Sequence, residues 1–242
     1  MKLFSLLISL LPAYCLFISC GNNTTGPGDP PESGAIETMG RYDFGCNDVP
    51  SPNSDFVAVA DGYFNCLGVK EDGSIVAWGC TCSVPSPNSG FVSVAVGEAH
   101  SLGLKANGSI VAWGDNSYGQ CDVPEPNSGF VAVAGGDFNS LGLKDDGYIV
   151  VWGFDEWEEC SVPEPNSGFV SVAAGDHHFL GLKEDGSIIA WGSNLLGQCD
   201  VPSPNSGFVA VAGGYGHSLG LKEVSTTVQF SPLMAVEYSP PL

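Results

Sequence analysis

The chain has 242 residues, including 33 Gly and 17 Pro, and 14% of its residues are charged while 43% are hydrophobic. This composition is too apolar for a disordered chain and too rich in turn-forming residues for a helical bundle, so it predicts an all-β protein. Lys and Arg number 7 against 27 Asp and Glu, a formal net charge of -20. Such a surface repels phosphate groups, which excludes nucleic acid as a partner.

Residues 1–20 have the features of an export signal peptide. Lys2 precedes an apolar run that is too short to span a bilayer comfortably. The run ends in Phe17-Ile18-Ser19-Cys20, which resembles the bacterial lipobox, where the Cys becomes the lipid-modified first residue of the mature protein. We therefore expect Cys20 to anchor the protein in the bacterial cell envelope, at the outer membrane or cell surface. A plain secretory signal and a secreted protein are the alternative.

Residues 21–41 lack an apolar period and are dense in Gly, Pro, Asn and Thr. This composition predicts a flexible tether that holds the folded region clear of the membrane. The folded region is expected at 42–230, followed by a C-terminal tail at 231–242. Membrane contact is expected through the lipid anchor alone.

A repeat with a period of 39 residues fills the folded region, and it is marked by aromatic residues in register. Five copies can be counted, the first of them four residues shorter than the others. A period of this length indicates a solenoid or a propeller. The marker residues are Phe91, Phe130, Phe169, Phe208, Trp113, Trp152 and Trp191.

Within one copy, three segments alternate or are β-branched, at 130–134, 140–144 and 148–152, and each predicts a strand. Asp145-Asp146-Gly147 predicts a tight turn between the second and third strands. Residues 160–163 predict a short fourth strand ended by proline. Four antiparallel strands in each copy are the plan of a β-propeller blade.

Two motifs carry a family resemblance. Gly97 to Lys105 and Asn107 to Asn116, with Gly119-Gln120 following, resemble the repeats of the regulator of chromosome condensation family. The resemblance covers about 42–223, and the Val-Pro ending is similar to a bacterial subgroup that contains a secreted β-lactamase-inhibitor protein. It implies a β-propeller, usually of seven blades, so five copies depart from the family pattern.

The two ends of the repeat region predict how five copies close a ring. Residues 44–50 parallel 118–124, the end of a copy, and 223–230 align without gaps on 184–191, placing Val228 on Ile189 and Phe230 on Trp191. The last blade would take three strands from the C-terminus and its outer strand from 44–50, which removes the free edges. We expect a closed five-bladed ring. A truncated array that opens, swaps or oligomerises is the alternative.

Neither the cysteines nor the histidines indicate catalysis or metal binding. Four cysteines share one repeat position, too far apart for disulfides, and are expected to be buried thiols: Cys82, Cys121, Cys160 and Cys199. His100, His178 and His217 share a position that Asn fills in other copies, which favours a structural role. Paired zinc motifs, calcium loops and a nucleophile elbow are absent. We therefore expect no catalytic residue, no cofactor and no metal, and not an enzyme.

Differences among the copies gather at two sites, the turn between strands one and two and the loop after strand three. Both connections emerge on the same face of an up-and-down blade, while the near-invariant turns emerge on the opposite face. Aromatic groups among polar ones are typical of protein interfaces, although divergence of exposed loops also explains the variation. The candidate partner-binding residues are Tyr63, Phe64, Glu98, Asp137, Phe138, Phe154, Asp155, Glu156, Trp157, Asp176, His177 and Tyr215.

Trp157 also aligns with Tyr118 and Leu196, so packing between blades is an alternative role for it. The sequence thus predicts a non-catalytic, exported lipoprotein whose propeller displays one variable acidic and aromatic face to a protein or cell-surface ligand. Inhibition of a secreted or periplasmic enzyme such as a β-lactamase is one alternative. A carbohydrate-binding adhesion module is the other.

Overall fold

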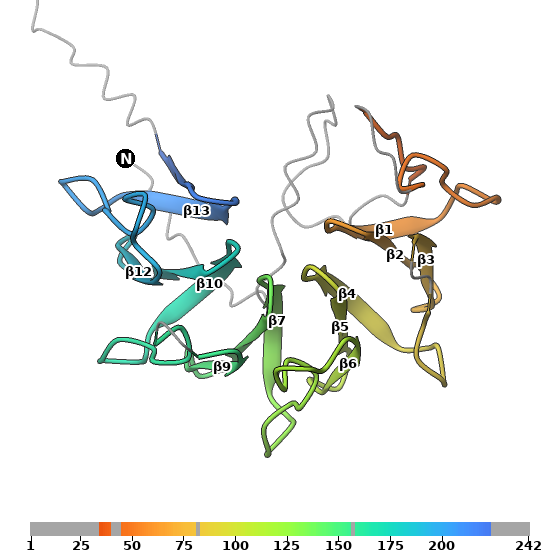
Figure 1. Cartoon of the computed structure of the whole chain (residues 1–242), viewed down its shortest axis with the longest axis horizontal. Coiled ribbons are helices and arrows are strands. Elements are labelled where there is room, and N and C mark those ends of the chain that lie inside the picture. The colour runs from red at the N-terminus through yellow and green to blue at the C-terminus, as the bar shows by residue number, and fades with distance from the viewer. Residues whose placement is uncertain (1–33, 40–44, 81–82, 156–157, 224–242) are drawn as a thin grey trace, which may run out of the picture.

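The computed structural model describes residues 34–39, 45–80, 83–155 and 158–223. These residues form five antiparallel sheets arranged in an arc (Figure 1), which we number blades 1 to 5 in chain order. Four blades have three strands each and blade 5 has two. The strands are β1 Phe56–Asp61, β2 Asn65–Lys70, β3 Ile75–Gly79, β4 Phe91–Val96, β5 His100–Lys105, β6 Ile110–Gly114, β7 Phe130–Gly135, β8 Asn139–Lys144, β9 Ile149–Gly153, β10 Phe169–Ala174, β11 His178–Lys183, β12 Ile188–Gly192, β13 Phe208–Gly213 and β14 Ser218–Lys222.

This architecture confirms the predicted all-β propeller, with consecutive strands paired inside each blade. Among the described residues, no helix has the length and apolar character needed to cross a membrane.

Each blade is built around a Phe at the start of its first strand that lies over a Gly in its second strand. In blade 3, a Cβ atom added to Gly142 would lie 2.5 Å from a ring carbon of Phe130, so only Gly leaves room for the ring. The Nζ of Lys144 lies 4.1 Å from the centroid of the same ring, in a cation–π contact. The equivalent trios are Phe56, Gly68 and Lys70; Phe91, Gly103 and Lys105; Phe169, Gly181 and Lys183; and Phe208, Gly220 and Lys222.

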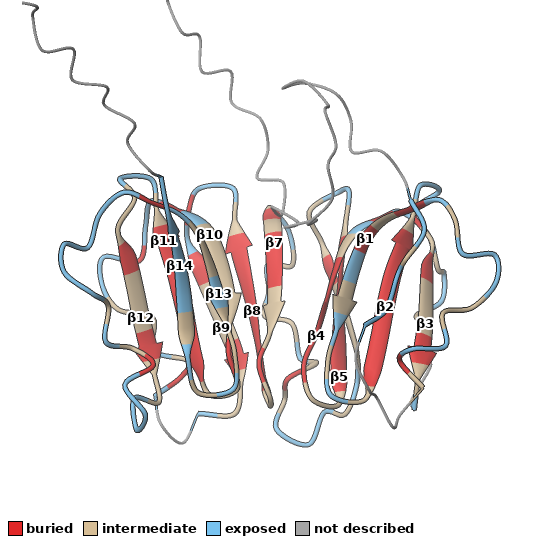
Figure 2. Ribbon diagram, turned by 90° about the horizontal axis from the view of Figure 1, so that it is seen from above, coloured by how far each residue is buried: buried red, intermediate tan, exposed pale blue. Residues whose placement is uncertain are grey.

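The hydrophobic core lies between successive blades. Leu141 and Leu143 of β8 are buried against Phe169 and Trp191 of the following blade, and equivalent clusters join the other neighbours. The second strand is therefore the most buried element of blades 1 to 4 (Figure 2).

The predicted fourth strand is not formed in the described part of the chain. Residues 160–163 make no ladder with β9, because their loop uses their backbone donors: Cys160 N–H donates to Asp155 Oδ1 at 3.0 Å and Ser161 N–H to Glu158 O at 3.0 Å. The following Val162-Pro163 offers one backbone donor fewer. Each complete blade consequently has three strands and an outer loop.

The fold begins earlier than the boundary expected at residue 41. Gly34 exchanges backbone hydrogen bonds of 3.0 Å with Phe56, and Asn53 binds both the N–H and the C=O of Ile36, at 2.7 and 2.8 Å. Asn88 binds Ile75 in the same way. Residues 34–39, expected to belong to the tether, therefore occupy the place of a third strand belonging to a blade before blade 1.

The predicted pairing of 44–50 with 223–230 lies largely outside the described residues, and the described residues form an open arc instead of a closed ring. Blades 1 and 5 stand at its two ends (Figure 1). Leu219 and Leu221 of β14 are 63% and 51% exposed, whereas Leu180 and Leu182, their equivalents in β11, are buried. The difference arises because blade 5 has no blade packed on its outer face in this arc.

The cysteines differ from the predicted buried thiols in two ways. Cys46 and Cys66 form a disulfide. Cys121, Cys160 and Cys199 are half-buried, not buried as predicted, because the thiol of each lies near a loop carbonyl at the edge of its blade, as Cys121 Sγ does at 3.2 Å from Asp115 O. Burial raises the pKa of Cys121 and Cys160 to about 11, so these two thiols stay protonated at neutral pH. Cys82 lies outside the described residues.

Candidate functional site

The two sets of variable loops lie together on one face of the arc, as predicted. Within each three-stranded blade, the loop after strand three donates a backbone hydrogen bond to the turn between strands one and two. Asp115 N–H reaches Ala99 O at 2.9 Å, Phe154 N–H reaches Phe138 O at 3.1 Å, and Ser193 N–H reaches His177 O at 2.8 Å. We call this side of the molecule the variable face.

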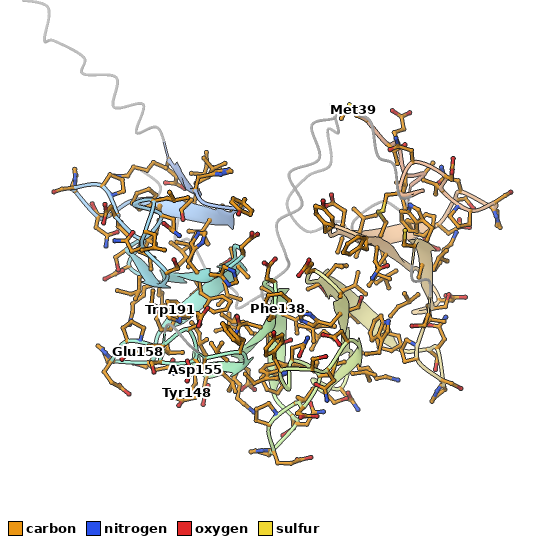
Figure 3. The ribbon with its side chains drawn as sticks, in the orientation of Figure 1. Met39, Phe138, Tyr148, Asp155, Glu158 and Trp191 are labelled. Carbon is orange, nitrogen blue, oxygen red and sulfur yellow. A yellow bond between two sulfur atoms is a disulfide. The ribbon has the colours of Figure 1, made fainter. Side chains whose placement is uncertain are left out.

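An aromatic cluster forms at the centre of the variable face. The rings of Phe138 and Phe154 lie 6.2 Å apart between centroids, which confirms that the two variable loops of blade 3 bring them close. Tyr118 from blade 2 contacts both rings at 5.0 Å and is 48% exposed. Figure 3 shows Phe138 in the middle of the arc, with Asp155 on the loop beside it.

The remaining predicted aromatics are not part of this cluster. Tyr63 and Phe64 contact each other on blade 1, with ring centroids 4.7 Å apart. Tyr215 is 79% exposed on blade 5. Glu156 and Trp157 lie outside the described residues. The structure therefore gathers the central part of the predicted set and leaves the two outer blades separate.

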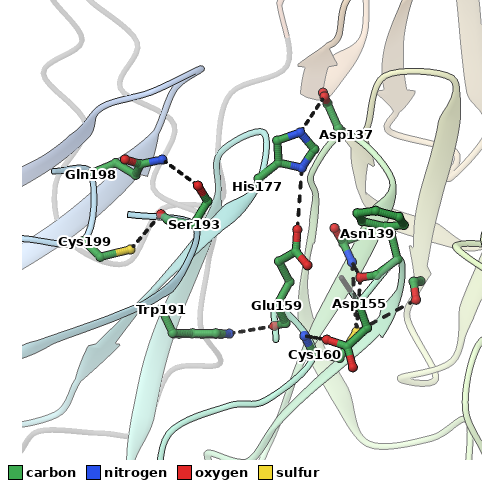
Figure 4. A network of polar contacts seen from close by, with 12 residues as sticks. Asp137, Asn139, Asp155, Glu159, Cys160, His177, Trp191, Ser193, Gln198 and Cys199 are labelled. Carbon is green, nitrogen blue, oxygen red and sulfur yellow. Dashed lines mark hydrogen bonds and ion pairs between the residues drawn. The ribbon is translucent and has the colours of Figure 1, made fainter. Parts of the chain in front are cut away.

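An acidic row runs beside the aromatic cluster. Glu98, Asp137 and Asp176 occupy the same turn position in blades 2, 3 and 4, and their turns are joined by backbone hydrogen bonds from Glu98 N–H to Asp137 O at 3.4 Å and from Asp137 N–H to Asp176 O at 3.0 Å. His177 bridges this row to the next loop, with Nε2 3.6 Å from Asp137 Oδ2 and Nδ1 3.6 Å from Glu159 Oε1 (Figure 4).

The carboxyl groups of the acidic row hold their protons more tightly than exposed carboxyl groups do. Burial, reinforced by the neighbouring charges of Asp137 and Glu98 and opposed by His177, raises the pKa of Asp176 to about 6. Burial also raises the pKa of Asp137 and, together with the Asp137 charge, that of Glu98. The negative charge of this row consequently develops at a pH closer to neutral than usual.

This shift predicts a pH dependence of stability. Because folding raises the pKa of Asp176 from 3.8 to about 6, the folded state binds this proton more tightly, and its contribution to stability is lost as the pH rises through that window. Chemical denaturation at several pH values should show the free energy of unfolding of Asp176→Asn falling less steeply across the window than that of the wild type. Equal slopes for the two proteins would contradict the assignment.

Two residues of this site were missed from the sequence. Tyr118 was considered only as the repeat equivalent of Trp157, although an aromatic residue at a variable loop was the signal used elsewhere. Glu159 is fully buried and replaces the Gln found at 120 and 198. A charged residue at a repeat position that is otherwise a neutral Gln was the sequence signal that could have identified it. The backbone carbonyl of Glu159 accepts the indole N–H of Trp191 at 2.9 Å.

Two of the three histidines that share a repeat position, His100 and His178, make structural contacts, as predicted. His100 is fully buried and its Nε2 lies 2.9 Å from Ser140 Oγ of the next blade; His178 makes the same contact with Ser218 at 2.9 Å. Burial lowers the pKa of His100 to about 4, so the ring is neutral. Over the described ranges, no three His, Cys, Asp or Glu side chains converge as metal ligands.

Comparison with protein families matches two stretches, residues 91–120 and 169–198, to the regulator of chromosome condensation (RCC1) repeat. The matches fall on blades 2 and 4 and confirm the resemblance seen in the repeat motifs. No curated protein sequence matches the chain.

Solved structures with the same fold include two plant receptor kinase ectodomains and a yeast protein. The CRINKLY WD40 ectodomain of ACR4 from Arabidopsis thaliana has a TM-score of 0.60 and 22% identity, over 76% of this chain and 66% of that one. The CR4 ectodomain from Physcomitrella patens has a TM-score of 0.60 and 23% identity, over 72% of this chain and 49% of that one. Prp20p from Saccharomyces cerevisiae has a TM-score of 0.60 and 20% identity, over 69% of this chain and 56% of that one. The chain thus spans about half to two thirds of these proteins, and at these identities the likeness establishes the fold.

Proposed function

We propose that this chain, a propeller built from RCC1 repeats, is a non-catalytic, exported lipoprotein that binds another protein through its variable face. The observation that carries the proposal is the cluster of Tyr118, Phe138 and Phe154 beside the acidic row on that face. Partly exposed aromatic side chains that are surrounded by polar groups are the usual anchors of protein interfaces. Cys20 would hold the protein in the cell envelope, facing its partner there.

Rigid display is the mechanism that we propose. The loops of the variable face are tied to each other within each blade and to the next blade by backbone hydrogen bonds, so few rotatable bonds need to be ordered when a partner binds. The acidic row and the exposed Asp155 and Glu158 favour a partner with a basic surface around an apolar patch. Charge complementarity would then speed association, and the aromatic cluster would supply most of the affinity.

Known partners of one structural neighbour are consistent with a binding role. Crystal structures of Prp20p are described with its binding to Gsp1p and histones and with Kap60 bound to it. Those partners belong to that protein. What is proposed for this chain is the general role of a propeller as a protein-binding surface.

Truncating the central rings tests this proposal. Phe138→Ala with Phe154→Ala should weaken partner binding by about 2 kcal/mol or more, roughly a 30-fold loss of affinity, if the rings are hot spots. The measurement is affinity capture from envelope extract with the full chain in detergent, followed by titration of each captured protein. A β-lactamase panel, assayed for inhibition, runs in parallel.

The matched control is Asp146→Asn with Asp185→Asn, on the opposite face. Each carboxylate accepts a backbone hydrogen bond, Asp146 from Tyr148 and Asp185 from Ser187, and the amide oxygen of Asn preserves that bond. Retained binding by this control and loss by the double Ala variant would support the variable face. The reverse pattern would overturn it.

A further inference from the structure

Among the described residues, each end of the arc holds half of an unfinished blade, and the two halves are complementary. Residues 34–39 stand in the place of a third strand in front of blade 1, whereas β13 and β14 are the first and second strands of blade 5. Ile36 packs close to Gly68 of blade 1: a Cβ atom added to Gly68 would lie 3.4 Å from the terminal methyl carbon of Ile36. The same contact joins blades 3 and 4, where a Cβ atom added to Gly181 would lie 3.2 Å from the terminal methyl carbon of Ile149.

A pocket beside β14 matches the position that the third-strand Trp fills in complete blades. In blade 3, Trp152 packs among Leu102, Ile110 and Val123 of the preceding blade. The equivalent side chains, Leu180, Ile188 and Val201, line a pocket of about 290 Å³ together with Ser218 and Gly220 of β14.

At the other end of the arc, Met39 is an exposed apolar side chain. It follows Ile36 by three residues, as Trp191 follows Ile188, so it holds the Trp position of its half blade. Its side chain is 93% exposed, and Figure 3 shows it at the N-terminal end of the arc, far from Trp191. An exposed Met and a pocket lined by the equivalents of the residues around Trp152 therefore lie at opposite ends of the molecule.

We propose that β14 and this pocket bind residues 34–39 of a second copy of the chain, which supplies the missing third strand of blade 5. The register follows from β11 and β12, where Leu180 pairs with Ala190 and Leu182 with Ile188. It places Leu219 opposite Thr38 and Leu221 opposite Ile36 of the second copy, with Met39 in the pocket. The strand edge and the exposed leucines would both be covered.

Two observations favour the second copy over segments of the same chain. The described blades hold β14 and residues 34–39 at opposite ends of the arc (Figure 1), so binding within one chain would require every interface between blades to change. Residues 224–230 carry Ser225 where blade 4 has Gly186 at a φ of +77°, and Thr227 where it has the buried Ile188. Residues 34–39, in contrast, keep a Gly at the first of these positions, Gly34, and an Ile at the second, Ile36.

This contact joins two different surfaces of the protomer, so it generates chains or rings of copies that extend head to tail. It is independent of the partner proposed for the variable face, because it uses the ends of the arc. A copy bound in this way would present its own variable face as well. Assembly would thereby multiply the binding sites on one membrane.

Cysteine cross-linking between differently tagged copies tests the register. One copy carries Thr38→Cys, the other carries Leu219→Cys, and both carry Cys80→Ser and Cys82→Ser to remove competing thiols. Mild oxidation of the mixed full-length chains in detergent should give a mixed disulfide dimer. Ala35→Cys in place of Thr38→Cys, which is out of register, should give at least tenfold less.

The mass of the assembly supplies a second measurement. Light scattering should show association that rises with protein concentration, and Met39→Asp should abolish it without unfolding the protomer, because Met39 is exposed. Tyr148→Asp, at a Tyr that is 48% exposed in blade 3 and away from both ends of the arc, is the control and should leave association unchanged. A monomer at every concentration, or a cross-link only within one chain of a Thr38→Cys, Leu219→Cys double variant, would overturn the proposal.

Discussion

Replacing Cys46 and Cys66 together by Ser should lower the free energy of unfolding by about 3 kcal/mol. The disulfide joins residues separated by 20 positions, and losing it enlarges the set of conformations open to the unfolded chain. It also ties the N-terminal segment to β2, next to the indole of Trp78, whose N–H donates to Cys46 O at 2.8 Å.

The choice of Ser isolates the covalent contribution. In blade 3, Ser140 Oγ, at the repeat position of Cys66, donates to Gln120 O at 2.7 Å, so Cys66→Ser retains a hydrogen bond that other blades use. Chemical denaturation of the oxidised protein provides the measurement, and reduction of the wild type should reproduce the loss. Cys199→Ser is the control and should change stability by much less. Equal stability of the double Ser variant and the oxidised wild type would contradict this prediction.

The disulfide illustrates what repeat comparison can and cannot reveal. Cys121, Cys160 and Cys199 share one repeat position, and none of the three forms a disulfide. Cys46 and Cys66 stand instead at two different repeat positions, which are filled by Gln120 of blade 2 and Ser140 of blade 3. Those positions touch across a blade boundary, which becomes visible only when the backbone is placed.

The strands and the variable face were predictable because both depend on local pattern and on strand parity. Phe138 and Phe154 are close because each follows a strand end of one blade, which the register of the repeat determines. The outer loop was harder to predict, since a short β-branched run ending in Pro163 also fits a strand. Its backbone donors instead bind Asp155 and Glu158 within the loop, and these contacts depend on side-chain positions that the pattern does not specify.

The segment before residue 41 was misjudged for a different reason. Gly34 and Ile36 match the glycine and isoleucine of every third strand, but the Gly and Pro residues around them have the composition of a tether. The three apolar residues in these six, Ala35, Ile36 and Met39, do not alternate, so their pattern does not distinguish a strand from a linker. The contacts with Phe56 and Asn53 identify the segment, because they repeat contacts found between complete blades.

Adding one methyl group at Gly142 should destabilise the protein as strongly as removing the disulfide. In Gly142→Ala, the new Cβ would lie 2.5 Å from one carbon of the Phe130 ring and 3.2 Å from Ile110. The ring is 3% exposed and has no open space to enter, so β7 and β8 must separate or the core between blades 2 and 3 must repack. Overpacking of this kind costs about 3 kcal/mol, to be measured by chemical denaturation.

Two further variants separate steric conflict from backbone effects. Gly168→Ala places a Cβ at a φ of +72° with no atom within 4 Å, so it should cost only the backbone strain, about 1 kcal/mol. Phe130→Leu removes the ring that causes the conflict, so Gly142→Ala should cost at least 1 kcal/mol less in that background than in the wild type, since contacting residues are energetically coupled. An equal cost in both backgrounds would mean that the Phe over Gly contact does not determine the packing of the blade.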